Sequence, residues 1–480
     1  MAEAQNNVPI LHRKEWQTMT PAPTATVAGA FVISGTSGNR RYSLYMVSAT
    51  VHYLYDHNGD DWLPIVSGAF GGTFGAGACG AHLPWSITYT ATGGSTTTLT
   101  VNAATHNING NVVGDEIEFL TGTAGNIGQR RTITAIETNG GTGTITITFN
   151  AAPSSVANND TFRISSGSFF VLSAGTLAAT SFRRYDIATG AWSSLTNTGL
   201  PASWGTDGRL VSPYLRSDSY DSGTATSGSS TTLVCTGKGW TNDQWINYQV
   251  RITAGTGVGQ KSRITDNTTD TLTFGAGATI DATSQFVIEG DENALYALGN
   301  NAVTMYKYSI SGNSWATVAP TTARAGAPIA GMSADWVGET GDTNWADITD
   351  IKDGRYIYSL RGGTSVLDRF DISGGTNGAG AWLAVTYQPS LQTFATGDST
   401  EWLGQYLYIA KEGTAAIPQR FYKYDLIGNT VFPMTSDWYF GGAALLGNKI
   451  WVKNLSTAGT VKWLYCLQST STNLRRIMLF

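Results

Sequence analysis

The chain has 480 residues, a formal net charge of −5 and 13% charged residues, while 11% of its residues are aromatic. So few charges of either sign provide no basic surface for direct nucleic-acid readout, and so many aromatic residues exclude a disordered chain. Its 57 glycines and its many Thr and Ser residues favour an all-β protein with tight turns.

The opening residues 1–16 contain no apolar core of the kind that a secretion signal needs, and no apolar run in the chain is long enough to span a membrane. Three widely separated cysteines, Cys79, Cys235 and Cys466, predict buried thiols rather than a disulfide framework or a metal motif. The basic pairs at 130–131 and 183–184 predict edge or surface charges on strands.

One pattern recurs along the chain: an aromatic-rich strand, a turn with Gly or Asn, and then an aromatic or large apolar residue. A short strand with large apolar residues at two-residue spacing precedes each copy. The six copies occupy residues 52–62, 182–192, 305–315, 367–382, 421–432 and 463–474. Gly- and Ala-rich stretches further upstream, such as 27–34 and 73–81, predict an innermost strand for each unit.

Each unit therefore predicts a four-stranded sheet that cannot cover both of its faces alone. Radial stacking would cover them, with the repeated aromatic side chains packed between sheets, so the sequence predicts a six-bladed β-propeller. The units resemble kelch-type blades, which carry a Gly pair like Gly362–Gly363, a strand like FYKYD at 421–425 and a following Trp like Trp315. The copper-radical oxidase of that class needs histidine ligands in the later part of its chain. No histidine follows His106 here, which removes this enzyme as an interpretation.

Two intervals are too long for one blade. Trp62 and Trp192 are 130 residues apart, and Trp192 and Trp315 are 123 apart, against roughly 40–50 residues per blade. The extra segments 86–167 and 217–290 match each other piece by piece, with GTAGNIGQ in one and GTGVGQ in the other. We expect two homologous small β-barrels of five or six strands. Their Gly-rich turns lack the Lys-Ser/Thr ending of a phosphate loop and no helix follows, which favours hairpin turns.

Both insertions are expected after the innermost strand of a blade, and therefore side by side on one face. The remaining chain divides into an N-terminal arm (1–24), the first blade and the start of the second (25–85), the rest of the second and start of the third (168–216), and the other blades (291–480). Segments 16–21 and 473–479 both look like outer strands, and only one is needed to close six blades. We expect one to close the ring and the other to be an arm.

The GTGVGQ-type modules, together with the opening LHRKEWQTMTPAP at 11–23, are similar to structural proteins of tailed-bacteriophage virions. This resemblance implies a non-enzymatic neck, tail or capsid-attached protein, made in the host cytoplasm without a signal peptide. It implies other virion proteins as partners and homo-oligomerisation in a ring or spike. The residues themselves predict no cofactor, no membrane contact and no direct nucleic-acid readout.

A second hypothesis is a receptor-binding spike that binds or cleaves a host surface glycan. An acidic loop with two tryptophans motivates it, since such side chains bind sugars, cleave them or bind Ca²⁺, although a solvated loop is the alternative. The candidate residues are Trp336, Asp342, Trp345, Asp347 and Asp350.

Two histidines near the first aromatic copy have acidic neighbours at a turn. A metal site at His52 and His57, beside Asp56, Asp60 and Asp61, is one interpretation, and exposed turn polarity is the simpler one. No motif for nucleophilic catalysis is found in the sequence.

Overall fold

The computed structural model is built almost entirely from β strands. It describes residues 17–23, 31–34, 42–46, 52–56, 59–64, 78–83, 85–104, 113–139, 143–173, 175–205, 208–212, 220–277, 279–299, 302–326, 334–337, 356–387, 391, 393–394, 398–403, 405–411, 420–434, 449–454, 462–467 and 474–479. Within these ranges the one helical element is a short 3₁₀ turn at Thr376–Gly378. No helix in the described ranges has the length and hydropathy to cross a membrane.

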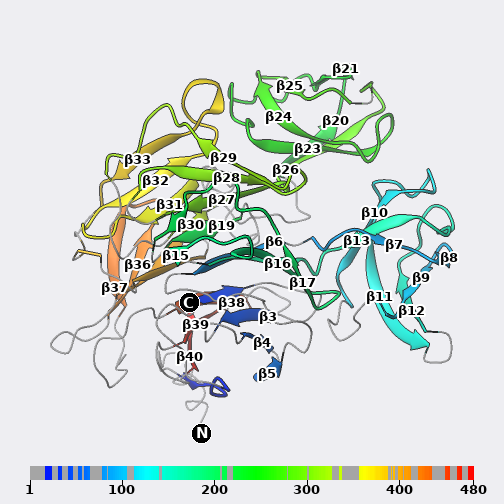
Figure 1. Ribbon diagram of the computed structural model, residues 1–480. Coiled ribbons are helices and arrows are strands. Elements are labelled where there is room, and N and C mark those ends of the chain that lie inside the picture. Colours follow the sequence, from blue (N-terminus) through cyan, green and yellow to red (C-terminus); the bar gives the residue numbers. More distant parts are fainter. Residues whose placement is uncertain are drawn as a thin grey trace, which may run out of the picture.

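Six four-stranded antiparallel sheets form the body of the protein (Figure 1). The first is β2 (Phe31–Ser34), β3 (Tyr42–Met46), β4 (His52–Asp56) and β5 (Asp61–Pro64); the second is β6 (Cys79–Leu83), β14 (Ser168–Leu172), β16 (Phe182–Asp186) and β17 (Ala191–Ser194); the third is β19 (Arg209–Val211), β27 (Ala294–Leu298), β28 (Met305–Ser309) and β29 (Ser314–Val318). The fourth is β30 (Ala334–Val337), β31 (Tyr356–Leu360), β32 (Leu367–Asp371) and β33 (Ala381–Val385); the fifth is β34 (Ser399–Leu403), β35 (Tyr406–Lys411), β36 (Arg420–Asp425) and β37 (Thr430–Met434); the sixth is β38 (Lys449–Asn454), β39 (Lys462–Leu467), β40 (Leu474–Leu479) and β1 (Gln17–Thr18).

The first strands of neighbouring sheets lie beside one another. β2 contacts β6, β6 contacts β19, β19 contacts β30, β30 contacts β34, β34 contacts β38, and β38 contacts β2. A small two-stranded sheet of β15 (Gly175–Thr176) and β18 (Ser203–Trp204) lies outside this series. The all-β, propeller-like arrangement that the repeat predicted is therefore confirmed.

The repeated Tyr and the turn after it form a local unit. Tyr308 lies opposite Trp315 in the β28–β29 pair, and its hydroxyl donates to Asn313 Oδ1 over 2.6 Å. Asn313 has a φ of 42°, a backbone conformation that Asn tolerates better than most residues. The Tyr424 hydroxyl donates to Asn429 Oδ1 in the same way, over 2.6 Å. A side-chain hydrogen bond between residues five apart thus fixes each tight turn.

Aromatic side chains fill the space between neighbouring sheets, as expected. The ring of Phe182 in the second sheet lies 4.8 Å from Tyr308 and 5.0 Å from Trp315 in the third, measured between ring centroids. Tyr358 of the fourth sheet and Tyr424 of the fifth are 6.2 Å apart in the same sense. These buried contacts cover sheet faces that a single unit leaves exposed.

The two ends of the chain meet in one sheet. Gln17 and Thr18 of β1 pair with Arg476 and Arg475 of β40, and Arg476 donates to Gln17 Oε1 over 3.0 Å. We expected one terminal segment to close the ring and the other to be an arm. This is wrong, because both segments are strands of the sixth sheet, in which β38 is the innermost of the described strands. β40 is then the third strand and β1 the fourth. Part of the expected N-terminal arm is therefore a strand of the sixth sheet.

Each inserted segment forms a seven-stranded antiparallel sheet rather than one of five or six strands. The first module contains β7 (Tyr89–Thr90), β8 (Gly93–Gly94), β9 (Thr98–Asn102), β10 (Glu116–Thr121), β11 (Arg130–Asn139), β12 (Thr144–Phe149) and β13 (Thr161–Ile164). The second contains β20 (Asp221–Thr224), β21 (Ser227–Gly228), β22 (Thr232–Val234), β23 (Tyr248–Ala254), β24 (Lys261–Asn267), β25 (Thr271–Phe274) and β26 (Gln285–Gly290).

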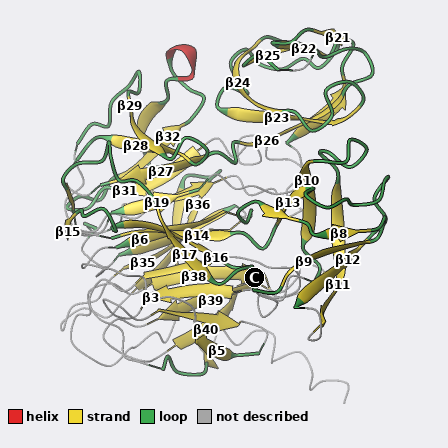
Figure 2. Cartoon of the chain, turned by 45° about the vertical axis from the view of Figure 1, so that its right-hand side comes forward, coloured by secondary structure: helices red, strands yellow, loops and turns green. Residues whose placement is uncertain are grey.

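The two modules share one strand order. It is β7-β13-β10-β11-β12-β9-β8 in the first and β20-β26-β23-β24-β25-β22-β21 in the second. The count exceeds the expectation because the entering chain is split into two short strands, which are the two edges of the sheet in each module. The modules lie between β6 and β14 and between β19 and β27, at the predicted points, and Figure 2 shows them side by side. All three cysteines are buried and free, as predicted.

Candidate functional site

Most of the loop that the sequence predicts as a glycan-binding site lies outside the described residues. Asp342, Trp345, Asp347 and Asp350 lie outside the described residues, and Trp336 lies in β30, opposite Ile357 of β31. No metal-binding group of three or more His, Cys, Asp or Glu residues occurs among the residues that the structure describes.

The metal hypothesis at the first turn has a simpler explanation. His57 lies outside the described residues, and His52 lies in β4, opposite Met46. The carboxylate of Asp60 accepts hydrogen bonds from the Tyr55 hydroxyl and from the Thr20 backbone N–H. Asp60 therefore holds its turn, as Asn313 and Asn429 do in other sheets.

The two modules touch through their matching Gly-rich turns. Gly128 precedes β11 in the first module, and Gly259 takes the equivalent place before β24 in the second. A Cβ atom on Gly128 would lie 2.4 Å from the Gly259 Cα, so the two backbones meet with no room for a side chain. Equivalent residues in contact imply a local two-fold relation between the modules.

Charged side chains surround this contact, and they pair across it. Glu118 of β10 has no exposed surface, and its Oε1 lies 2.7 Å from Lys261 Nζ of the second module. Arg130 of the first module lies 3.5 Å from Glu289 Oε1 of the second. Within the modules, Arg163 Nη2 lies 2.6 Å from Glu118 Oε2, and Arg251 Nε lies 3.0 Å from Glu289 Oε1.

The strand registers explain why this pairing is complementary. Glu118 lies opposite Arg130 in the first module, and Arg251 lies opposite Lys261 in the second. Arg130 and Lys261 are thus equivalent, and so are Glu118 and Arg251. The charge is positive at both Arg130 and Lys261. At the other pair of equivalent positions it is negative for Glu118 and positive for Arg251. Each module consequently presents a carboxylate and cations that match those of the other module.

The linkers to the body join the same network. Trp85 follows β6, and the Arg163 guanidinium lies 4.1 Å from its ring centroid, with Arg130 at 4.7 Å. Glu292, between β26 and β27, accepts from Arg163 over 2.8 Å and from Lys261 over 3.1 Å. A cation that lies above an indole ring and pairs with a buried carboxylate is held more strongly than a cation in an exposed ion pair. The modules are therefore fixed both to each other and to the sheets that carry them.

Two carboxylates of this network keep their charge. Burial raises the pKa of Glu118, but the positive charges of Arg163, Lys261 and Arg130 outweigh it and lower the pKa below its usual value of 4.5. Burial also raises the pKa of Glu292, and the same cations outweigh this effect, so the pKa of Glu292 is lowered as well. Both side chains are ionised at neutral pH, so the network stays intact there.

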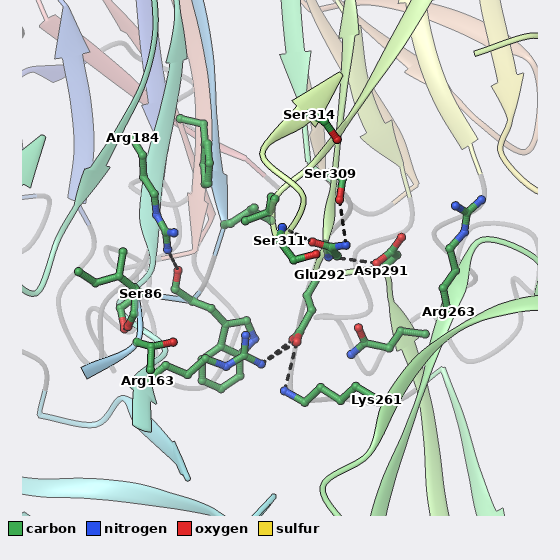
Figure 3. A pocket seen from close by; sticks show the side chains of 18 of the residues that line it. Ser86, Arg163, Arg184, Lys261, Arg263, Asp291, Glu292, Ser309, Ser311 and Ser314 are labelled. Carbon is green, nitrogen blue, oxygen red and sulfur yellow. Dashed lines mark hydrogen bonds and ion pairs between the residues drawn. The ribbon is translucent and has the colours of Figure 1, made fainter. Parts of the chain in front are cut away.

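A cleft of about 680 Å³ opens beside the network, between the two modules and the second and third sheets (Figure 3). Its charged lining residues are Arg163, Arg184, Lys261, Arg263, Lys307, Asp291 and Glu292. Its hydroxyl and amide side chains are Ser86, Thr88, Gln249, Ser262, Asn293, Ser309, Ser311 and Ser314. Polar groups from four separate parts of the fold thus converge on one space, which is the arrangement of a binding site.

Sequence reasoning missed this site. The basic pairs predict edge or surface charges on strands, but the Arg130 side chain is only 10% exposed and packs on Trp85. The available signal was the match itself, because the Gly-Gln of each turn is followed by Arg130 or Lys261 at equivalent positions. A basic position kept in both modules beside a close backbone contact indicates an internal interface.

No family model matches the chain, and neither does any curated protein. Among solved structures, it is similar to YjhT, with a TM-score of 0.36, 8% identity, and coverage of 96% of this chain and 97% of the other. A luciferin-regenerating enzyme gives a TM-score of 0.24 at 8% identity, covering 65% and 88%. An auxiliary nutrient binding protein from Bacteroides ovatus gives 0.24 at 10% identity, covering 80% and 82%. These neighbours are propeller-like proteins.

Proposed function

We propose that this chain is a non-enzymatic structural component of a tailed-phage virion, placed at the neck, on the tail or on the capsid. It makes protein–protein contacts in a symmetric assembly. The observation that carries the proposal is the locked pair of modules, joined through Gly128 and Gly259 and through the Lys261–Glu118 ion pair. Two copies of one module, fixed as a single unit beside a propeller-like body, make a rigid docking surface.

Rigidity is the useful property here. A surface whose parts are already ordered loses little conformational entropy on binding, so more of its contact energy remains as affinity. The contact of two glycine backbones and the buried carboxylate of Glu118 leave little freedom between the modules. This suits a part that repeats the same contact around a ring or spike.

The finer architecture belongs to the same proposal. The six four-stranded sheets are six kelch-like blades, and β1 beside β40 closes the ring by joining the two ends of the chain. Each module is a closed barrel. The two strands at the ends of its strand order, β7 and β8 in the first module, follow each other directly in the chain, so the chain connects one edge of the sheet to the other. Closure of this kind removes exposed strand edges, which would otherwise promote uncontrolled aggregation.

Sedimentation velocity of the purified full-length chain over its whole soluble range, with negative-stain imaging of each species, tests the proposal. We expect a discrete homo-oligomer with a defined rotational symmetry. A monomer at every concentration, with no symmetric particles in the images, would overturn the structural role.

A further inference from the structure

The cleft beside the two modules has an excess of positive charge. Its lining contains five Arg and Lys side chains against two Asp and Glu side chains, although the whole chain carries a net charge of −5. A concave surface with low-dielectric walls concentrates the potential of such an excess. The cleft therefore favours an anionic ligand.

Some of these cations already have partners. Arg163 and Lys261 pair with Glu118 and Glu292, and Lys307 Nζ lies 3.5 Å from Asp291 Oδ2. These three charges are largely neutralised within the protein. They shape the cleft and hold its walls, and a ligand would gain little by displacing their carboxylates.

Two arginines differ from the rest. Among the described residues, no carboxylate lies within ion-pair distance of Arg184 or Arg263, although the charge of Asp186 acts on Arg184 from further away. Arg184 Nε donates to Ser168 Oγ over 2.8 Å and its Nη2 donates to the Trp85 carbonyl over 3.0 Å, while Arg263 is exposed and donates to Asn247 Oδ1. Figure 3 shows them on opposite walls of the cleft. A guanidinium suits a carboxylate, which accepts two parallel hydrogen bonds from it.

A wall of short hydroxyl side chains lies between the two arginines. Ser309, Ser311 and Ser314 come from β28, β29 and the turn that joins them, and Asn293 donates to Ser309 Oγ over 3.3 Å. A hydroxyl both donates and accepts hydrogen bonds, as the hydroxyls of a sugar do. Ile87, which is 37% exposed, adds an apolar surface that suits the C–H faces of sugar rings.

From these features we infer that the cleft binds an acidic oligosaccharide, a short glycan that carries carboxylate groups on its sugars. Arg184 and Arg263 bind the carboxylates, and the serine wall binds the sugar hydroxyls. The volume of about 680 Å³ lies within the range of small-ligand sites and accommodates a few sugar units. An acidic peptide has no comparable set of hydroxyls to match this wall. The inference does not depend on the assembly role.

Isothermal titration calorimetry of the full-length chain tests the inference with four probes. These are trigalacturonic acid, neutral galactotriose, a hexaglutamate peptide and inorganic phosphate. We expect trigalacturonic acid to bind at least about tenfold more tightly than each of the others, and more weakly as salt is raised. No binding of trigalacturonic acid, or equal binding of the peptide, of galactotriose or of phosphate, would overturn the inference.

Variants locate the binding in the cleft. Arg263→Gln should weaken binding of trigalacturonic acid by about tenfold or more, since a hydrogen bond to a charged group is lost. Ser311→Ala should weaken it too, and this exposed side chain can be removed without loss of the Ser311 backbone bond to Asn293. Arg131→Gln is the matched control, because Arg131 lies on β11, the strand of the first module that is equivalent to β24 with Arg263, and is outside the cleft lining.

Unchanged affinity in both Arg263→Gln and Ser311→Ala would place the saccharide elsewhere and refute the inference. Sedimentation of the same samples separates this result from the assembly proposal. A chain that binds no saccharide but forms a symmetric oligomer loses only the cleft inference, and a monomer that binds it loses only the assembly role.

Discussion

Replacing Glu118 with Ala should release the two modules from each other. The wild-type carboxylate has no exposed surface and lies 2.6 Å from Arg163 and 2.7 Å from Lys261, which belong to different modules. Removing it leaves these cations and Arg130 close together without their shared counter-charge. Breaking one partner out of a buried ion pair costs about 3–5 kcal/mol, so we expect the junction to open more easily by that free energy.

Hydrogen exchange measured by mass spectrometry reports this opening directly. Amides of the two Gly-rich turns, 123–128 and 255–260, should exchange on the order of 100-fold faster in Glu118→Ala, which corresponds to the lower end of that free energy. Glu118→Gln should show an intermediate effect, because it keeps the volume but loses the charge. Glu137→Ala is the control, since Glu137 is exposed on β11 of the same module.

Unchanged exchange at both turns in Glu118→Ala would refute the reasoning, because the ion network would then contribute nothing to the junction. An equal increase in Glu137→Ala would refute it as well. In that case the first module would be sensitive to any loss of a carboxylate rather than to the loss of the shared counter-charge.

Three other predictions concern the ion network, the contact between the two modules, and the contact of the second module with the fourth sheet. The pKa values of Glu118 and Glu292 are lowered in the folded chain, so their contribution to stability is complete above their usual pKa of 4.5 and is lost as pH falls through the folded values. The melting temperature should therefore be constant from pH 7 to 5 and should drop below pH 4.5. Gly128→Ala should separate the modules, because the added Cβ clashes with the Gly-rich turn of the second module. Gly143→Ala is the control, since Gly143 has a similar positive φ of 63° and nothing within 4 Å of an added Cβ. Small-angle scattering should show the separation in the first variant only. Asn247→Ala should loosen the second module from the fourth sheet, because Asn247 Nδ2 donates to the Ile372 and Gly378 carbonyls over 2.6 and 2.9 Å. The amides of residues 372–378 should then exchange hydrogen faster, and unchanged exchange would contradict this prediction.

The sequence by itself determined the repeating units and the insertions. Alternating apolar residues and turn residues act between close neighbours, as the Tyr308 hydroxyl and Asn313 show, so hairpins can be found from short segments. The homology of the two modules followed from the same kind of local match, and so did their positions between β6 and β14 and between β19 and β27.

Only the tertiary structure decided how these units meet. The pairing of Gln17 with Arg476 joins opposite ends of the chain, and no local pattern specifies it. The burial of Arg130 against Trp85 and the Lys261–Glu118 pair likewise depend on segments far apart in sequence. The cleft is made by side chains from both modules and two sheets, so it exists only after they pack. A charge on a strand looks the same in sequence whether it faces water or a partner, because its environment is set by the packing of whole sheets.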